Sequence, residues 1–343
     1  MLHGGQPPVT ASSADMSLNQ ETGRDRYFAA RERELALLLD PATGMLADRY
    51  AKTVPCPLCG SKQWRTLFIK HGFTFVRCAE CRLVFSNPQV RDDLVETEYR
   101  SGGSNDIWVE VLLSERQLEI DRSKFSDLLD ELEPVRGEGR LLDVGCSIGL
   151  FLELARSRGW SGVGIEFSDR ARTYAVDALG LDVVATSLES TGWRDASFDV
   201  ITLNSVIEHL NDPRRVLGEV RRLLKPRGAL YLITPNVESL ACRLLHEQTA
   251  TFDGRNHLVY FSAATLTRAL EAEGFRVQSM STHIASLQPM LEWLASETPY
   301  SDTPLDQDAF ASWLEQDDRR AALEDAICAS GLGYKLHSLA TAI

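Results

Sequence analysis

Two cysteine pairs are the first residues in this sequence whose types and spacing could do chemistry. Cys56 and Cys59 form one C-x-x-C pair, Cys78 and Cys81 form another, and 18 residues lie between the pairs. Two thiolates from each tight turn can close a tetrahedral shell around a zinc ion and leave no position open for water. The alternative is a hairpin whose cysteines stay reduced and unligated. We therefore expect a structural Zn²⁺ at these four residues.

The segment around these cysteines, residues 54–90, has the pattern of a small zinc ribbon. WRTLFIK and FTFVRC are β-prone and meet at His71 and Gly72, which predicts a hairpin between the two pairs. Residues 51–90 hold six lysines and arginines against one acidic residue, so this module is basic. It could bind nucleic acid or a protein, or it could serve as a cap that covers one face of the next domain.

A glycine-containing loop is the second candidate site. It reads Asp143-x-Gly145-x-x-x-Gly149, follows the apolar segment RLLDV and opens a helix at LFLEL. The glycines permit a tight turn and let a ligand approach the backbone, while the helix start offers N–H groups. Glu166 closes the next strand, where a carboxylate can accept both hydroxyls of a ribose. An acid ahead of the first glycine repels a pyrophosphate and suits a ligand that carries an ammonium group.

This combination resembles the class I S-adenosylmethionine-dependent methyltransferases, whose usual loop reads D-x-G-x-G-x-G. Ser147 stands where the family usually has its middle glycine. The E-H-L sequence from Glu208, followed by Asp-Pro, is frequent in small-molecule methyltransferases of the quinone-biosynthesis type. The resemblance covers about residues 139–284 and the last strand at 332–342. It implies S-adenosyl-L-methionine as the cofactor.

The resemblance also assigns cofactor contacts residue by residue. Glu166 would bind the ribose, with Phe167 beside the adenine, and Asn204 would lie beside the methionine portion and the reacting methyl group. Many relatives place an acid where this chain has Ser187, so that contact with the adenine amino group would be weaker or made by backbone. The full set of expected cofactor residues is Asp143, Gly145, Cys146, Gly149, Glu166, Phe167, Ser187, Leu188 and Asn204.

Two histidines are candidates for the general base that methylation of a hydroxyl needs. Histidine suits this role because its pKa lies near neutral pH. His209 is the first candidate, because it follows a strand at the carboxyl edge of the sheet, where ligands bind. The alternative is that it only caps or packs the next helix. His257 is the second candidate, in the segment DGRNHLVY. We expect Asn236, just after a strand, to orient the substrate, and Tyr260 either to line the substrate pocket or simply to pack.

Alternating β and α segments after Arg140 must position these residues. RLLDVG, GVGIEF, LDVVAT, FDVITLNS, ALYLIT and FRVQSMSTHI read as strands with helical segments between them. Short apolar strands that alternate with helices predict an α/β fold with a mostly parallel sheet covered on both faces. With the resemblance, we expect a Rossmann-like, seven-stranded sheet, a small N-terminal zinc ribbon and helical cap segments.

The expected organisation has five parts. A disordered tail is rich in Gly, Pro, Ser and Thr, and a charged helical stretch leads into the ribbon. Helical segments on either side of the catalytic region would roof the acceptor pocket. The predicted boundaries are 1–22 for the tail, 23–53 for the lead-in, 54–90 for the ribbon, 91–135 for a helical linker or cap, and 136–343 for the methyltransferase domain with a helical insertion at about 285–330.

Composition limits the class of protein. The chain has 343 residues, of which 44% are hydrophobic and 25% charged, and its formal net charge is −13. These values exclude a fibrous or wholly disordered chain, and the acidic balance disfavours a general nucleic-acid binder. No apolar run approaches the roughly 18 residues of a membrane span, and the start lacks the pattern of a secretory signal. We expect a cytoplasmic protein.

The sequence therefore predicts a methyltransferase that transfers a methyl group from S-adenosyl-L-methionine to a small-molecule acceptor, such as a saccharide or secondary metabolite. One alternative is an RNA or protein methyltransferase that uses the basic ribbon to deliver its substrate. A second is a non-catalytic module with a methyltransferase fold that binds a partner. Intact Asp143, Gly145, Gly149 and Glu166 argue against the second alternative.

Overall fold

The structure is a computed structural model of the chain. The residues it describes are 21–91, 93–94, 100, 103–284, 287, 313 and 316–343. The tail expected at 1–22 lies outside the described residues except for its last two positions. Most of the insertion expected at 285–330 also lies outside them. Among the described helices, none is both long enough and apolar enough to cross a membrane.

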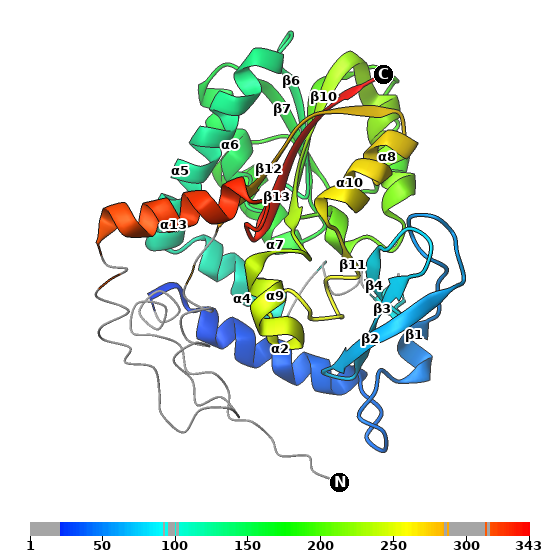
Figure 1. Ribbon diagram of the computed structural model, residues 1–343. Coiled ribbons are helices and arrows are strands. Elements are labelled where there is room, and N and C mark those ends of the chain that lie inside the picture. Colours follow the sequence, from blue (N-terminus) through cyan, green and yellow to red (C-terminus); the bar gives the residue numbers. More distant parts are fainter. Residues whose placement is uncertain are drawn as a thin grey trace.

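A seven-stranded sheet forms the centre of the molecule (Figure 1). Its order is β12-β13-β10-β9-β6-β7-β8, and only β13 runs antiparallel to its neighbours. The expected Rossmann-like, mostly parallel sheet is therefore confirmed. The strands are β6 (Arg140–Val144), β7 (Ser161–Ile165), β8 (Val183–Val184), β9 (Phe198–Asn204), β10 (Leu224–Pro235), β12 (Phe275–His283) and β13 (Lys335–Ala342).

Helices cover both faces of this sheet. Successive strand side chains point to opposite faces, so Tyr231 of β10 packs in one apolar cluster and Leu232 packs in the other. In Figure 1, α5 and α6 lie on one side of the sheet and α8 and α10 on the other. The helices are α2 (Arg24–Leu38), α4 (Gly103–Leu112), α5 (Glu115–Leu132), α6 (Leu150–Ser157), α7 (Asp169–Thr173), α8 (Pro213–Leu223), α9 (Leu240–Leu245), α10 (Ala263–Ala272) and α13 (Asp317–Ala329).

Short helical turns connect several of these elements. The 3₁₀ turn that follows β9 matters most for the site, because it brings the E-H sequence to the carboxyl edge of the sheet. The 3₁₀ turns span Asp48–Tyr50, Glu133–Val135, Leu188–Ser190, Ile207–His209 and His246–Gln248, and a π turn spans Tyr174–Ala178.

The cysteine module forms a four-stranded sheet, and one strand of that sheet comes from the chain after β10. The order is β11-β4-β3-β2, and β11 pairs antiparallel with β4. A further two-stranded sheet joins β1 to β5. The strands are β1 (Ala51–Lys52), β2 (Trp64–Lys70), β3 (Phe73–Cys78), β4 (Val84–Ser86), β5 (Gln89–Val90) and β11 (Val259–Tyr260). The hairpin expected between the cysteine pairs is β2–β3, but the sequence did not indicate its union with β11.

An apolar cluster fixes this union. Phe75 is fully buried, and its ring lies 5.5 Å from the ring of Phe252 and 5.6 Å from that of Tyr260, centroid to centroid. Gly254 lies against the same module, because a Cβ there would approach Phe73 to 2.4 Å. The module and the segment 250–260 therefore share one core, and neither could move far without the other.

The charged helix α2 also packs on the segment 250–260. Glu34 accepts hydrogen bonds from the backbone N–H and the hydroxyl of Ser104, both at 2.6 Å, and pairs with buried Arg255 at 2.9 Å. Arg31 forms an ion pair with Asp253. Part of the charge of this helical stretch therefore anchors α2 and α4 over the site.

Candidate functional site

A cavity of about 940 Å³ opens where β6, β7 and β9 end. In open α/β sheets ligands bind at the carboxyl ends of the strands, and this cavity lies at that edge. Helices α2, α4 and α5 supply a further wall, including Tyr27, Trp108 and Lys124. The predicted site residues that line the cavity are Asp143, Gly145, Cys146, Glu166, Phe167, Ser187, Leu188, Asn204, His209 and His257.

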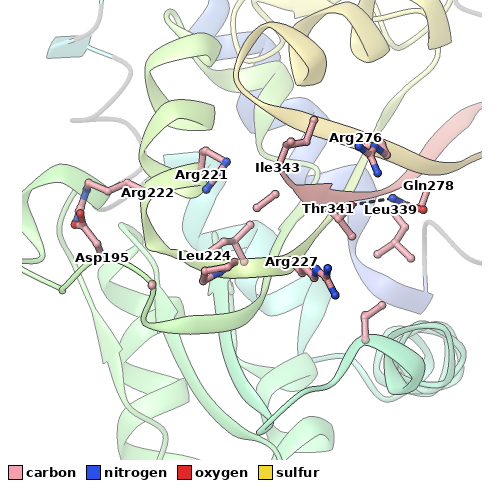
Figure 2. A pocket seen from close by; sticks show the side chains of 14 residues that line it. Asp195, Arg221, Arg222, Leu224, Arg227, Arg276, Gln278, Leu339, Thr341 and Ile343 are labelled. Atoms are coloured by element: carbon pink, nitrogen blue, oxygen red, sulfur yellow. Dashed lines mark hydrogen bonds and ion pairs between the residues drawn. The ribbon is translucent and has the colours of Figure 1, made fainter.

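A second cavity, of about 1000 Å³, lies at the opposite end of the sheet. Its lining includes four arginines from α8, β10 and β12, namely Arg221, Arg222, Arg227 and Arg276 (Figure 2). Arg222 is paired with Asp195 at 2.7 Å and with Glu219 at 2.9 Å. None of the site residues predicted from the sequence lines this cavity.

The loop after β6 has backbone that depends on its glycines. Gly145 and Gly149 have φ of 74° and 79°, in the left-handed region. A Cβ on Gly145 would lie 2.7 Å from Val206, and one on Gly149 would lie 2.5 Å from Leu181. Ser147 also takes a left-handed conformation, with φ of 52°. It therefore adopts the geometry of the glycine that it replaces.

Asp143 lies at the base of the loop with its side chain buried. Its Oδ1 accepts a hydrogen bond of 2.7 Å from the hydroxyl of Thr202. Burial, with the nearby charge of Glu166, raises the pKa of Asp143 to about 7 although the Thr202 hydrogen bond opposes the shift. A positive ligand group beside this carboxyl would favour its ionised form.

Glu166 closes the cavity at the end of β7. Its Oε2 accepts from the backbone N–H of Ser147 at 2.9 Å, and its Oε1 accepts from that of Ser168 at 2.6 Å. Burial raises the pKa of Glu166, and these backbone hydrogen bonds oppose the rise. Because each carboxylate oxygen has two lone pairs, both can still accept hydroxyls from a bound ribose.

Other expected cofactor positions surround this carboxylate. Phe167 follows Glu166 directly, while Ser187 donates its hydroxyl to Ser190 at 3.1 Å. Cys146 is buried, and burial raises the pKa of its thiol well above the usual value, so it stays neutral. Its sulfur packs closely against Gly164, because a Cβ added to that glycine would lie only 2.4 Å from the sulfur. The loop glycines, the two carboxyls and the apolar wall fit S-adenosyl-L-methionine.

At the other end of the cavity two imidazoles face each other. The rings of His209 and His257 lie 4.9 Å apart, edge to face. His209 Nδ1 donates to the carbonyl of Asn256, and His257 Nδ1 donates to that of Thr251, each at 2.9 Å. Because a carbonyl can only accept, both Nδ1 atoms carry the proton and both Nε2 atoms are acceptors when the rings are neutral.

The two histidines differ in their surroundings. Burial, and then the charge of His257, lowers the pKa of His209 to about 4. Asp253 Oδ2 lies 3.8 Å from His257 Nδ1. Although burial opposes ionisation, His257, Arg31 and backbone N–H groups lower the pKa of Asp253 to about 2. Asp253 is therefore a permanent negative charge behind His257.

Sequence reasoning missed Asp253. Its Oδ1 accepts from the backbone N–H groups of Arg255, Asn256 and His257, at 2.9, 2.8 and 3.1 Å. The only local signal was the Asp-Gly pair four residues before His257, which is typical of a turn. That turn folds the carboxylate back under the histidine.

Glu208 was also missed as a site residue, although it is part of the E-H sequence. It is buried, and its Oε2 accepts from Thr234 at 3.0 Å. Within the described part of the chain its Oε1 has no hydrogen-bond partner. Ligand atoms of Glu208, His209 and His257 lie within 4.8 Å of one another. A carboxylate and two imidazoles at this spacing can share a proton or hold a divalent cation.

Asn236 and Tyr260 take structural positions next to the cavity. Neither is among the residues that line it. Asn236 donates to the carbonyls of Gly331 and Gly333 at 3.1 and 3.0 Å, which ties β10 to the turn before β13. Tyr260 donates to the carbonyl of His257 at 2.5 Å and is buried. It acts on the site through the backbone of the His257 segment.

The four cysteines of the module come together as the spacing predicts. Cys56 Sγ lies 3.4 Å from Cys81 Sγ, and Cys59 Sγ lies 3.5 Å from Cys78 Sγ. All four sulfurs lie within 4.8 Å of one another. Tetrahedral zinc with Zn–S bonds of about 2.3 Å separates its sulfurs by about 3.8 Å, so the set fits this ion.

Protonation of these thiols supports the same interpretation. Burial raises the pKa of Cys56, and it raises that of Cys81 to about 11. At Cys78 burial also opposes ionisation, but the backbone N–H groups of Cys81 and Glu80 and hydrogen bonds from neighbouring cysteines lower the pKa to about 7. Thiols that are buried with raised pKa values ionise readily only when a cation joins them.

Comparisons with known proteins find similarity to methyltransferases. A family model described as a methyltransferase domain matches residues 115–280. A ubiquinone biosynthesis O-methyltransferase from Hahella chejuensis is 34% identical over 116 residues, which are 32% of this chain and 48% of that protein. Its counterpart from Paracidovorax citrulli is 32% identical over 115 residues, again 32% and 48%.

The chain spans about half the length of the curated relatives it matches. A solved structure titled as a SAM-dependent methyltransferase from Archaeoglobus fulgidus aligns with a TM-score of 0.45 and 18% identity, over 65% of this chain and 94% of that one. The family match lies on the sheet and the loop that form the cavity. Residues 115–280 therefore resemble a methyltransferase domain, and the sheet and loop that they form have the arrangement expected of the class I, S-adenosylmethionine-dependent type.

Proposed function

We propose that the protein transfers a methyl group from S-adenosyl-L-methionine to a hydroxyl of a small-molecule acceptor. One observation carries this proposal: a single cavity joins the carboxyls of Asp143 and Glu166 to the imidazoles of His209 and His257. The first pair suits a cationic cofactor with a ribose, and the second pair can accept a proton. The names of the O-methyltransferases that the chain resembles support oxygen as the acceptor atom.

The bound cofactor supplies an activated methyl group on a positive sulfur. The chain's residues hold the acceptor hydroxyl in line with that methyl group and keep water out, which provides much of the rate. His257 Nε2 would take the hydroxyl proton as the C–O bond forms and the methyl–sulfur bond breaks, with S-adenosylhomocysteine as the leaving group. Asp253, 3.8 Å from Nδ1 of the same ring, stabilises the imidazolium that results.

His257 suits this role better than His209. A base whose conjugate acid has a pKa of about 4 accepts a proton weakly at neutral pH, and this is the state of His209. His209 stays neutral, and its ring packs edge to face against that of His257. The order of the two candidates from the sequence is therefore reversed in our proposal.

The acceptor is proposed to contain a ring, as in a saccharide or a secondary metabolite. Tyr27 and Trp108 line the cavity with their rings 4.9 Å apart. Aromatic faces of this kind suit the apolar face of a sugar or an aromatic ring. The alternative, RNA delivered by the basic module, would appear as strong binding of RNA that weakens steeply with salt.

We propose in addition that the four cysteines hold one structural Zn²⁺. Cys56, Cys59, Cys78 and Cys81 would bind it as thiolates, and a shell of four sulfurs leaves no position for substrate. The ion would stabilise the module that β11 joins. No step of the reaction passes through it.

The cofactor assignment predicts loss of binding in Glu166→Ala. Removing a carboxylate that accepts the ribose hydroxyls should raise the Kd for S-adenosyl-L-methionine by about tenfold to a hundredfold. Isothermal calorimetry measures this directly. Exposed Glu271→Ala, in α10, is the matched control and should bind as the wild type does. Equal affinity of Glu166→Ala and wild type would contradict the assignment.

The ionisation of Asp143 should make the binding of S-adenosyl-L-methionine depend on pH. With a pKa of about 7 it is mostly ionised at pH 8 and mostly protonated at pH 6. A cationic ligand needs the ionised form, so the Kd for S-adenosyl-L-methionine should rise about tenfold between pH 8 and pH 6. Asp143→Asn should bind more weakly and lose this dependence. A variant with the slope of the wild type would exclude Asp143 as the titrating group.

The base assignment predicts unequal effects in the two histidine variants. His257→Gln should lower kcat by about a hundredfold or more and leave the Kd for the cofactor unchanged, because a general base contributes about 10²–10⁴-fold. His209→Gln should cost tenfold or less. The assay is transfer of a labelled methyl group to a panel of hydroxylated ring compounds, with exposed His246→Gln as control. Full activity of His257→Gln would refute the assignment.

The zinc assignment predicts about one zinc ion per chain by elemental analysis. Cys78→Ser should reduce the metal content and lower the midpoint of thermal unfolding, because binding of a structural metal contributes to folding. Cys328→Ser, outside the cluster, should retain both. Purified protein that folds fully without metal, and does not bind zinc when it is added, would contradict this part of the proposal.

A further inference from the structure

Gln89 is a buried amide that the proposed function does not use. It lies in β5, at the end of the cysteine module, and it is 0% exposed. Burying a polar side chain is unfavourable unless its donors and acceptor are paired. The partners of Gln89 are therefore informative about its role.

The Gln89 amide joins the two segments that carry the histidines. Its Oε1 accepts from Asn211 Nδ2 at 2.9 Å, and its Nε2 donates to the carbonyl of Leu258 at 3.3 Å. Asn211 is two residues after His209, and Leu258 is next to His257. One side chain of the cysteine-module region thus bridges both sides of the imidazole pair.

The backbone of Leu258 is held from two directions. Its N–H donates to the carbonyl of Glu208 at 2.8 Å, and its carbonyl also accepts from the backbone N–H of Ser86 at 3.0 Å. Ser86 ends β4 and Glu208 precedes His209, so the His257 segment is clamped between the module and the His209 turn. Gln89 closes this frame through Asn211.

The amide of Gln89 satisfies both partners at once. The bridge needs one acceptor for the Asn211 amide and one donor for the Leu258 carbonyl. A leucine offers neither, and a glutamate would place a second acceptor against the Leu258 carbonyl. The chemistry of the position therefore selects glutamine.

We infer that Gln89 is a positioning residue that fixes the spacing of the His209 and His257 rings. This inference rests on the proposed function, because the spacing of the imidazoles affects the rate only if they take part in the reaction. Gln89 acts through the two segments. A displacement of about 1 Å at a reacting group can cost about a hundredfold in rate, so a side chain outside the cavity can matter to catalysis.

The inference also gives the cysteine module a role in the site. The module contributes the β4 edge that pairs with β11, and Gln89 follows from the same segment. It therefore forms part of the scaffold that holds His257. Delivery of a polymeric substrate is not required to explain why the module and the methyltransferase domain are joined.

The test compares Gln89→Leu with the wild type and with Gln63→Leu, an exposed glutamine of the same module. Gln89→Leu keeps the approximate volume and removes both hydrogen bonds. We expect kcat to fall about tenfold or more, with the Kd for S-adenosyl-L-methionine within twofold of the wild type. Gln63→Leu should match the wild type in both. Unchanged kcat in a folded Gln89→Leu would overturn the inference.

A double-mutant cycle with Asn211→Ala shows whether the two residues act through one bond. If the bridge is the cause, the loss in Gln89→Leu, Asn211→Ala should be close to that of either single variant. Multiplied losses would mean that each residue acts separately, and the bridge would be rejected. Asn211 is only half buried, so its variant remains usable if Gln89→Leu does not fold.

The NMR signals of the histidine ring protons separate failure of the inference from failure of the proposed function. Gln89→Leu should shift the ring signals of His209 and His257 and leave those of His246 in place. Shifted signals in a protein without methyl-transfer activity would retain the positioning role and reject the proposed function. Unshifted signals would reject the positioning role, whether or not the wild type transfers methyl groups.

Discussion

The backbone of Leu258 is the point at which the two parts of the molecule are joined. Its N–H binds the turn after β9 and its carbonyl binds the end of β4. Leu258 is fully buried, so an unpaired N–H or carbonyl here would be costly. These hydrogen bonds fix the register in which β11 pairs with β4. The packing of Phe75 against Phe252 and the position of His257 depend on that register.

The site separates its charges by environment. Asp143 and Glu166 are both buried, and burial raises the pKa of both carboxyls. Asp253 is also buried, but Arg31, His257 and three backbone N–H groups keep it ionised. One end of the cavity can therefore respond to a cationic ligand, while the other end keeps a negative charge next to His257. This division suits the proposed transfer of a methyl group from a positive sulfur to a hydroxyl.

Much of this arrangement could be predicted because its signals are local. β6 and β9 are mostly buried and read as short, largely apolar strands, and the loop at Gly145 and Gly149 follows the first of them directly. The four cysteines were also predictable, since two tight turns at ribbon spacing bring the sulfurs together. Where residues close together in the sequence determine the geometry, the periodicity and spacing of residue types were sufficient to predict it.

The remainder depends on contacts between distant segments, which no local pattern encodes. The sequence could not show that β11 completes the module's sheet, that Arg31 of α2 holds Asp253, or that Gln89 bridges to Leu258. Asn236 was expected to orient the substrate because it follows a strand, and Tyr260 was expected either to line the pocket or to pack. In the structure the polar groups of both side chains bind backbone carbonyls.

A crystal structure of the protein with S-adenosylhomocysteine would test the central claim most directly. The claim is that one cavity holds the cofactor at the Asp143 and Glu166 end and presents its sulfur to the histidine end. We expect the ribose hydroxyls on Glu166, the adenine beside Phe167 and the sulfur directed toward His257. A ligand bound instead among the arginines at the opposite end of the sheet, or an adenine at the histidines, would contradict the account.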